Sequence, residues 1–387
     1  MVNSSSDRRT RLSLRLLCRR TVGRGYELPR IISGAGGGLL AATIFLLLIG
    51  TLTDCHHTDE PPVALVDTTS HNFIWTIETL GDGNSSRLCD VTIINDTLAY
   101  AVGIVNVFDS TGDFQIPPYN LARWNGKEWE LSTVIDSGFT FGAFYSIYAF
   151  GPNDIWMGSA GTPGHWDGKR WKFIGLNGEF PGGFYIMAIG GTSSRDLYMA
   201  GSGGNISRFD GAQWIAISSG TSAQIQDLWA GSNPLVGSNV VLAVAGQEFA
   251  AGDRKILRIK QGGAVDTIGW QAEDQRPMHS VWFTSESQIF LCGTGVFSYD
   301  GQVWNEHIAV PFYFTQKIRG NSSSDIVVVG DLGLVAHFNG STWHTYPELM
   351  LAAGQYNSVA IKGNTVIAVG ALAGSSKAVV ARGVRIQ

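Results

Sequence analysis

Short apolar runs recur along the chain, separated by polar turn residues. The clearest run ends in glycine and occurs seven times, as LAYAVG, DIWMG, DLYMAG, VLAVAG, QIFLCG, DIVVVG and VIAVG, ending at Gly103, Gly158, Gly201, Gly246, Gly293, Gly330 and Gly370. Runs of this length, rich in β-branched and aromatic residues and bounded by turn residues, predict β-strands. Their average spacing of about 44 residues is that of propeller blades. The chain is therefore expected to repeat one β unit seven times.

Each unit contains further strand signals. A second apolar run precedes each glycine run and is expected to be the innermost strand; the seven are DVTII (90–94), SIYAF (146–150), IMAIG (186–190), DLWAG (227–231), SVWFT (280–284), KIRG (317–320) and SVAIK (358–362). In five units a third strand leads into a hairpin, as WNGKEW (124–129), WDGKRW (166–171), FDGAQW (209–214), YDGQVW (299–304) and FNGSTW (338–343). Asn-Gly or Asp-Gly between strands predicts a tight type I′ hairpin. Each unit should thus be four antiparallel strands, with the flanking aromatic side chains packed in the sheet.

The last unit lacks its fourth strand, because the chain ends after KAVVARGVRIQ (377–387). An unpaired strand pattern, NFIWTIETL (72–80), stands before the first complete unit, with Trp75 in the place of a hairpin tryptophan. A ring of sheets closed by the two chain ends leaves few exposed edges. The sequence therefore predicts an all-β fold, a seven-bladed β-propeller over residues 72–387, with blade seven formed from about 356–387 and 72–80.

The first 54 residues have a different pattern. Residues 1–30 carry eight arginines and two acids, and the uncharged stretch from Ile31 to Thr53 is densest in LLAATIFLLLIG (39–50). A basic flank followed by an apolar run is typical of an export signal or a signal anchor. We expect this segment to direct the rest of the chain out of the cytoplasm and to the cell envelope.

Leu52-Thr53-Asp54-Cys55 follows the apolar run and resembles a bacterial lipoprotein signal, in which the cysteine is acylated. Leu52 fits that pattern, whereas Asp54 stands where a small residue is usual. Cys55 is therefore the predicted lipidation site, followed by a polar tether over 55–71; an uncleaved membrane anchor is the alternative.

Composition excludes several classes of protein. The 387 residues include 49 glycines and 12 tryptophans but only 15% charged residues, which excludes intrinsic disorder and coiled coil. Residues 55–387 hold 19 basic and 29 acidic residues, a net charge of −10, and such a domain repels nucleic acid. Two cysteines beyond Cys55, Cys89 and Cys292, do not make a disulfide framework.

The WDGxxW and DIWxxG repeats resemble those of exported bacterial β-propeller proteins, often lipoproteins, that are loosely labelled glucosyltransferase. The resemblance extends over nearly all of 67–387, from DTTSHNFIWTIETLGDG through PYNLARWNGKEWE to YNSVAIKGN. It implies the propeller fold and export. The enzymatic label has no catalytic motif that maps onto these residues.

No motif for a metal, a cofactor or a nucleophilic enzyme occurs, so we expect neither metal nor cofactor. The recurring Trp residues, and the polar residues Arg123, His165, Arg208 and His337 before the hairpin aromatics, are interpreted as packing and cross-blade contacts. Asp154, Asp196 and Asp325 occupy equivalent turns and are interpreted as turn caps.

The interruptions of the repeat are the candidate binding site, because insertions in repeats form loops on the binding face. The longest interval contains IVNVFDSTGDFQIPPYN (104–120) and IDSGFTFGAFY (135–145). Its aromatic residues are the predicted ligand contacts: Phe108, Phe114, Tyr119, Phe139, Phe141 and Tyr145. NPLVGSN (233–239) and QEFAAGDRK (247–255) are expected to belong to the same contact surface. The alternative is that the aromatic side chains only pack the loops onto the blades.

The favoured function is an exported, membrane-tethered binding module for a glycan or an envelope protein, without catalysis. A carbohydrate-active enzyme with channel carboxylates, and a structural subunit of an envelope assembly, are the alternatives. Carboxylates with raised pKa values in the channel would favour the enzyme.

Overall fold

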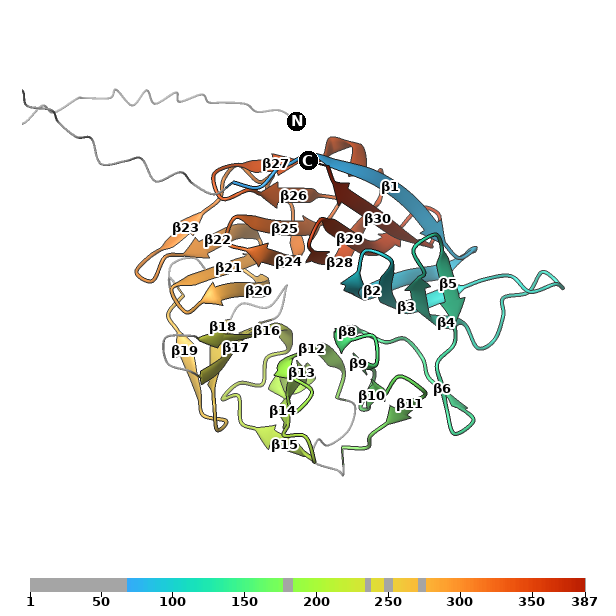
Figure 1. Ribbon diagram of the computed structural model, residues 1–387, viewed down its shortest axis with the longest axis horizontal. Coiled ribbons are helices and arrows are strands. Elements are labelled where there is room, and N and C mark those ends of the chain that lie inside the picture. The colour runs from blue at the N-terminus through green and yellow to red at the C-terminus, as the bar shows by residue number, and fades with distance from the viewer. Residues whose placement is uncertain (1–67, 177–183, 234–237, 247–252, 271–275, 387) are drawn as a thin grey trace, which may run out of the picture. The chain divides into compact units, whose positions relative to one another are not determined.

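The computed structural model describes residues 68–176, 184–233, 238–246, 253–270 and 276–386. In these ranges the chain forms seven four-stranded antiparallel sheets, arranged as blades around a central channel (Figure 1). The innermost strand of each blade contacts those of both neighbouring blades, so the ring is closed. The predicted all-β, seven-bladed propeller is confirmed. The signal segment and Cys55 lie outside the described residues.

In the first four blades the chain runs from the innermost strand outward. Blade one is β2 (Gly83–Asn95), β3 (Leu98–Asn106), β4 (Tyr119–Trp124) and β5 (Trp129–Ser132), and blade two is β8 (Ser146–Gly151), β9 (Asp154–Gly158), β10 (Pro163–Trp166) and β11 (Trp171–Phe173). Blade three is β12 (Ile186–Ser193), β13 (Asp196–Gly201), β14 (Ile206–Phe209) and β15 (Trp214–Ile217). Blade four is β16 (Ile225–Asn233), β17 (Ser238–Ala245), β18 (Lys255–Lys260) and β19 (Val265–Ile268).

The remaining blades have the same order of strands. Blade five is β20 (Met278–Ser285), β21 (Gln288–Gly293), β22 (Gly295–Tyr299) and β23 (Trp304–Glu306), and blade six is β24 (Thr315–Ser322), β25 (Asp325–Gly330), β26 (Val335–Phe338) and β27 (Trp343–Thr345). Blade seven is β28 (Gly354–Lys362), β29 (Thr365–Leu372), β30 (Lys377–Arg385) and β1 (Phe73–Leu80). A small hairpin, β6 (Ile135–Asp136) and β7 (Phe139–Thr140), and two short 3-10 turns, η1 (Ser202–Gly204) and η2 (Pro347–Leu349), lie in the connecting loops.

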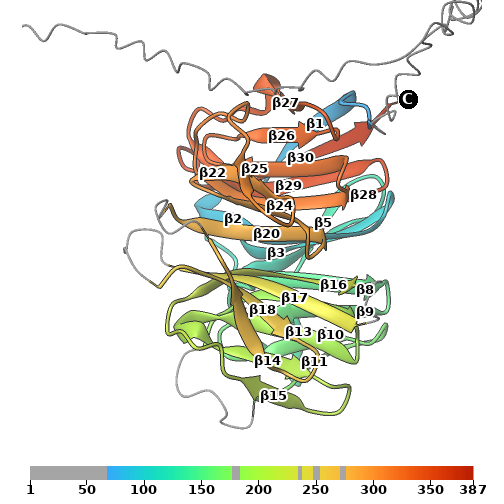
Figure 2. The same ribbon diagram turned by 90° about the vertical axis from the view of Figure 1, so that its left-hand side faces the viewer.

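The hydrophobic core lies between the blades, whose stacking Figure 2 shows from the side, because the clusters of buried apolar side chains join strands of neighbouring blades. The glycine runs form the second strand of each blade, and all six residues of β13 and of β25 are buried. These strands are buried because a neighbouring blade covers each face of the sheet. This explains why the runs are continuously apolar rather than alternating.

Blade seven is closed as predicted. β1 pairs antiparallel with β30 from Phe73, opposite Arg385, to Leu80, opposite Ala378. The ring of Trp75 lies over Gly383, where a side chain would collide with it. Chain ends about 300 residues apart in sequence therefore share one sheet.

The hairpin turns differ from the prediction. The aromatic pairs are cross-strand neighbours, such as Phe209 with Trp214, but four residues separate them and only the glycine of each loop has positive φ. A type I′ turn would need two residues with positive φ, so that expectation is wrong. Instead, the Asp or Asn side chain caps the loop; Asp210 Oδ1 accepts from the amides of Ala212 and Gln213 at 2.8 and 2.9 Å. These side-chain bonds hold the backbone of the four-residue loop in place.

The propeller has two different faces. We call the face at which the innermost strands begin the bulge face; it includes the loops 107–118, 133–145, 307–314 and 346–353. We call the opposite face the turn face; it includes the polar turns that follow the innermost strands and the Asp-Gly or Asn-Gly hairpins. β3 ends at Asn106 and β4 begins at Tyr119 at the bulge face, whereas β16 ends at Asn233 and β17 begins at Ser238 at the turn face.

Candidate binding site

Six of the seven innermost strands carry one extra residue near their beginning, and in blade two such a residue stands immediately before the strand. In blade one, Leu88 pairs with Gly103 and Asp90 with Val102, so Cys89 has no partner of its own. The same shift occurs in blades three to seven. In blade two, Tyr145 stands just before β8, and its amide donates to Gly158 O at 2.8 Å while Ser146 pairs with the same Gly158. The seven extra residues are Cys89, Tyr145, Met187, Gln226, His279, Gln316 and Asn357.

A β-bulge redirects its extra side chain. All seven of these side chains line one cavity of about 230 Å³ at the channel mouth on the bulge face, together with Arg87 and Lys317. Each of the seven blades thus contributes at least one side chain to one site. We call these residues the bulge ring.

The bulges also explain the repeated glycines. A side chain at Gly103, Gly201, Gly293, Gly330 or Gly370 would collide with a backbone carbonyl in, or one residue before, the adjacent innermost strand. In blade four the equivalent residue is Ala245, one position before Gly246, and in blade two Gly158 pairs one residue past the bulge. The fold therefore needs a small residue at this position. In five blades that residue is the glycine of the repeated run, and in blades two and four it lies one residue away from that glycine.

Two side chains of the bulge ring contact the backbone of the next blade. Asn357 Nδ2 donates to Leu88 O at 2.7 Å, and His279 Nδ1 lies 2.7 Å from Gln316 O. Gln226 Nε2 donates within its own blade, to Gly246 O at 2.9 Å. Burial raises the pKa of the Cys89 thiol to about 11 and lowers the pKa of His279 below its ordinary value. The ring is therefore neutral, with Arg87 and Lys317 as the cationic groups of this cavity.

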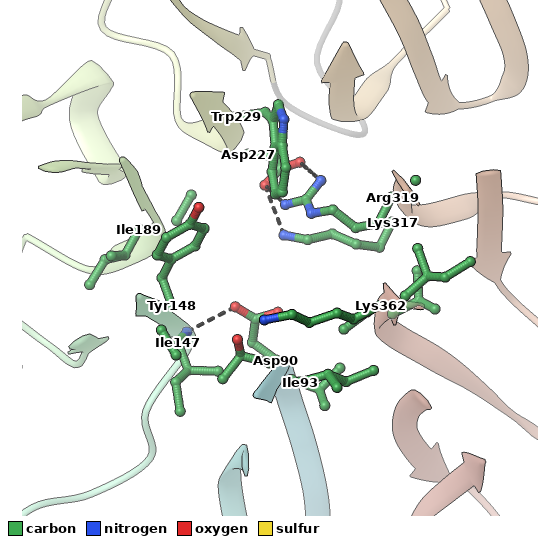
Figure 3. Close-up of a pocket in the computed structure, with 18 residues that line it drawn as sticks. Asp90, Ile93, Ile147, Tyr148, Ile189, Asp227, Trp229, Lys317, Arg319 and Lys362 are labelled. Carbon is green, nitrogen blue, oxygen red and sulfur yellow. Dashed lines mark hydrogen bonds and ion pairs between the residues drawn. The ribbon is translucent and has the colours of Figure 1, made fainter. Parts of the chain in front are cut away.

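Deeper in the channel lies a second cavity of about 180 Å³ (Figure 3). Asp227 of blade four is 1% exposed and faces Lys317 and Arg319 of blade six. Its Oδ1 lies 2.8 Å from Lys317 Nζ and 2.8 Å from Arg319 Nη2, and Ser280 of blade five donates to its Oδ2 at 2.5 Å. Burial alone would raise the pKa of Asp227, but the two cations outweigh burial and hold it well below its usual range.

Asp90 of blade one lines the same cavity from another side (Figure 3). Its Oδ1 accepts from Ser358 Oγ of blade seven at 2.5 Å, and its Oδ2 accepts from the amide of Ile147 of blade two at 2.9 Å. Each channel carboxylate therefore joins three consecutive blades. Asp227, an ionised group held by two cations, has the features of a structural ion pair and lacks the raised pKa that a general acid needs.

Exposed large apolar side chains are concentrated on the bulge face. In the described part of the chain fifteen such residues are exposed, and ten of them stand in bulge-face loops: Phe108, Ile116, Ile135, Phe139, Tyr185, Ile308, Phe312, Tyr313, Leu332 and Met350. Of the other five, Val303 alone stands in a turn-face hairpin. Backbone hydrogen bonds connect neighbouring loops, since Asp331 N donates to Phe314 O at 2.9 Å and Leu332 N to Gly354 O at 2.9 Å.

The aromatic residues expected as ligand contacts are dispersed. Phe108 and Phe114 stack on each other at 4.5 Å between ring centroids, and Phe108 is 48% exposed. Phe139 is 73% exposed in the β6–β7 hairpin, whereas Phe141 stacks on Phe173 at 3.6 Å. Tyr119 packs against a core cluster of blades one and seven, and Tyr145 belongs to the bulge ring. Their role in binding stays a prediction; of 247–255, the part 247–252 lies outside the described residues, as does 234–237.

Three of the recurring polar residues pair with an aspartate of their own blade. His165 Nε2 lies 2.9 Å from Asp154, Arg208 Nε 2.8 Å from Asp196, and His337 Nε2 2.9 Å from Asp325. The expectation of cross-blade contacts is wrong for these pairs, because β9, β13 and β25 lie beside the strands that carry the partners, but His337 also contacts the segment that leads into blade seven, with its Nδ1 2.8 Å from His71 Nδ1. Their recurrence in the same units was the signal available in the sequence. The bulge ring gave no such signal, since its residue types differ from blade to blade.

Neither a metal cluster nor a spanning helix is found in the described ranges. No group of three or more His, Cys, Asp or Glu side chains that could hold a metal ion is present there. No helix there is long and apolar enough to cross a membrane.

No family model and no curated protein matches this chain. Solved structures do match. One described as YCF48 bound to D1 peptide is 16% identical, with 83% of this chain and 100% of that chain covered and a TM-score of 0.59. At this identity the likeness establishes only the fold. The chain is a seven-bladed β-propeller.

Two other similar structures support this assignment. The RRP9 WD40 repeats are 8% identical, with 80% and 97% coverage and a TM-score of 0.57. YCF48 from Cyanidioschyzon merolae is 13% identical, with 79% and 98% coverage and a TM-score of 0.54. The resemblance to exported WDGxxW propellers and their glucosyltransferase label has no support from these comparisons and stays a prediction.

Proposed function

We propose that this propeller is a non-catalytic protein-binding module whose partner docks on the bulge face, and that it is exported and tethered through Cys55. The concentration of exposed apolar side chains in bulge-face loops is the observation that carries the proposal. Exposed apolar patches mark interaction surfaces, and loops on a rigid scaffold hold them in place. A similar structure is described as YCF48 bound to D1 peptide, so another propeller of this shape holds a peptide.

The chemistry of this face fits a protein better than a sugar. The Phe141 ring, which a sugar would stack on, is stacked on Phe173, and Phe108 is stacked on Phe114. Phe312 is 69% exposed, and Leu332 and Met350 are 41% and 40% exposed, which offers apolar anchors to a partner. The neutral amides of the bulge ring lie at the channel mouth on the same face.

The enzyme alternative has less support. It needs a channel carboxyl group that keeps its proton near neutral pH, whereas the pKa of Asp227 is lowered by Arg319 and Lys317. A structural role in an envelope assembly would use the same apolar surface. Such an assembly is one form of protein binding.

A photo-crosslinking residue placed at Phe312 or at Val303 tests the docking face in the native envelope. We expect one partner to be crosslinked from Phe312 and not from Val303, which is 51% exposed on the turn face. Phe312→Ser with Leu332→Ser should weaken binding of that partner at least tenfold, whereas Val303→Ser should leave it unchanged. Equal crosslinking from both faces, or unchanged binding by the double variant, would overturn the proposal.

The tether has its own test. We expect Cys55→Ser to prevent acylation and to leave the protein uncleaved at its signal, which an increase in mass and loss of labelled fatty acid would report. If wild-type protein incorporates no fatty acid and keeps residues 1–54, the segment is an uncleaved anchor and the lipoprotein proposal fails.

A further inference from the structure

A third cavity, of a different character, opens on the turn face between blades five and six. It has a volume of about 710 Å³, which lies in the usual range of small-molecule sites. Five of its twelve lining residues are serines: Ser287, Ser298, Ser322, Ser323 and Ser324. The rings of Tyr299 and Phe338 also line it.

The serines of the two blades face the groove without bridging it. At other blade boundaries, turn-face residues are joined: Asn239 Nδ2 donates to Thr192 at 2.8 Å, Arg258 pairs with Glu286 at 2.6 Å, and Asn321 Nδ2 donates to Gly363 O at 3.0 Å. Among the described residues, no hydrogen bond joins the serines of blade five to those of blade six. Four of the five hydroxyls bond within their own blade, as Ser322 does to Ser324 at 3.1 Å.

The hydrogen-bonding groups of this groove suit a polyhydroxylated ligand. Each serine hydroxyl can donate one hydrogen bond and accept others, as a sugar hydroxyl also does. Ser298 Oγ lies 2.9 Å from His307 Nε2, which orients that hydroxyl at the wall. The groove and a sugar can therefore exchange hydrogen bonds in either direction.

The aromatic rings supply the other half of sugar recognition, a flat apolar surface for the C–H face of a pyranose. The Tyr299 hydroxyl donates to Gly301 O at 2.9 Å, which fixes its ring. Phe338 is held by Trp343, with 5.2 Å between ring centroids, and by His307 at 5.7 Å. Both rings are partly exposed and rigid, so stacking on them costs little conformational entropy.

The electrostatics disfavour an anionic ligand. Burial lowers the pKa of His307, so this ring is neutral at pH 7. Asp300 is the one acidic group among the described lining residues, and no lysine or arginine stands among them. Phosphate and carboxylate ligands would therefore find a negative charge and no cation.

We propose that this groove, the serine groove, is a binding site for a neutral glycan. The site lies on the face opposite the protein-docking surface, so it does not depend on the function proposed above. It also lies away from the aromatic loop residues that the sequence suggested for a ligand.

The test uses the full-length protein in detergent and four neutral disaccharides: maltose, cellobiose, lactose and diacetylchitobiose. Saturation-transfer NMR and calorimetry measure binding to wild type, to Ser323→Trp and to Ser194→Trp. Ser323 stands two residues before Asp325, and Ser194 stands two residues before Asp196 in the same turn of blade three. Both are partly buried, so the second variant controls for the added indole.

We expect at least one disaccharide to bind at millimolar or lower concentration and Ser323→Trp, which fills the groove, to weaken it at least tenfold. Ser194→Trp should leave the affinity unchanged, and circular dichroism should show both variants folded. If no disaccharide binds, or if Ser323→Trp binds as tightly as wild type, the proposal is wrong. The crosslinking result at Phe312 is unaffected by either outcome.

Discussion

Asp227 shows how much of the channel depends on one side chain. A buried carboxylate is stable only when cations and hydrogen-bond donors replace its lost water. Lys317, Arg319 and Ser280 do this from two other blades, 53 to 92 residues further along the chain. The residue therefore links blades four, five and six.

Replacing Asp227 by Asn should destabilise the fold by about 3 kcal/mol, because it leaves Lys317 and Arg319 buried without a counter-charge. Urea unfolding followed by tryptophan fluorescence measures the change. Glu130→Gln is the control; Glu130 and its partner Arg123 are both about half exposed, so loss of that pair should change the unfolding midpoint little. Equal effects of the two substitutions would contradict a structural role for Asp227.

At the scale of the strand, the bulge is the repeated element of this propeller. It places an extra side chain at the channel mouth and brings the innermost strand close to the second strand. Alternation along a strand predicts which face a residue takes, but one inserted residue reverses it. This is why the sequence pattern located all seven innermost strands and did not identify the bulges.

Gly201→Ala should destabilise the protein by roughly 1 to 3 kcal/mol, since a methyl group there collides with the carbonyl of Tyr185. Gly151→Ala is the matched control, because a methyl group there meets no atom within 4 Å. Thermal and urea unfolding of the two variants are compared with wild type. If Gly201→Ala is as stable as Gly151→Ala, the close approach of the Tyr185 carbonyl is not the reason that glycine is needed at position 201.

At the scale of the whole molecule, the segment before β1 joins blade seven to blade six. Thr69 Oγ1 donates to Ser324 O at 2.6 Å, and His71 Nδ1 lies 2.8 Å from His337 Nδ1. A hydrogen bond between two ring nitrogens needs one that carries a proton and one that does not. The pair is therefore stable only if at most one of the two imidazole rings is charged. Burial, followed by the nearness of His337, lowers the pKa of His71 to about 4.

This pair predicts a loss of stability in acid. The ordinary histidine pKa is about 6.5, so below that pH the unfolded chain takes up a proton that folded His71 does not. The loss of stability due to His71 should be absent above about pH 6.5, grow as the pH drops towards about 4, and stay constant below that. Urea midpoints across this range measure it; His71→Asn should flatten the fall, whereas Thr69→Ala should lower all midpoints without changing the slope. An unchanged slope in His71→Asn would contradict the assignment.

The order of strands was determined by the sequence alone, because its signals are local. Glycine-ended runs, capped hairpins and an orphan strand around Trp75 each extend over a few residues, and together they give seven blades and the closing strand. The turn type was predicted wrongly since Asp-Gly occurs both in tight turns and in longer capped loops. The local pattern therefore predicted the architecture more accurately than its details.

The sites were decided only by the tertiary structure. Asp90 meets Ser358, Asp227 meets Lys317, and the turns around Ser287 and Ser323 form one groove because ring closure brings these distant segments together. Whether a loop aromatic is packed, as Phe141 is on Phe173, or exposed, as Phe312 is, depends on what the neighbouring blade supplies. The periodicity of the sequence predicts which residues are buried, whereas strand register and ring closure decide which residue each one contacts.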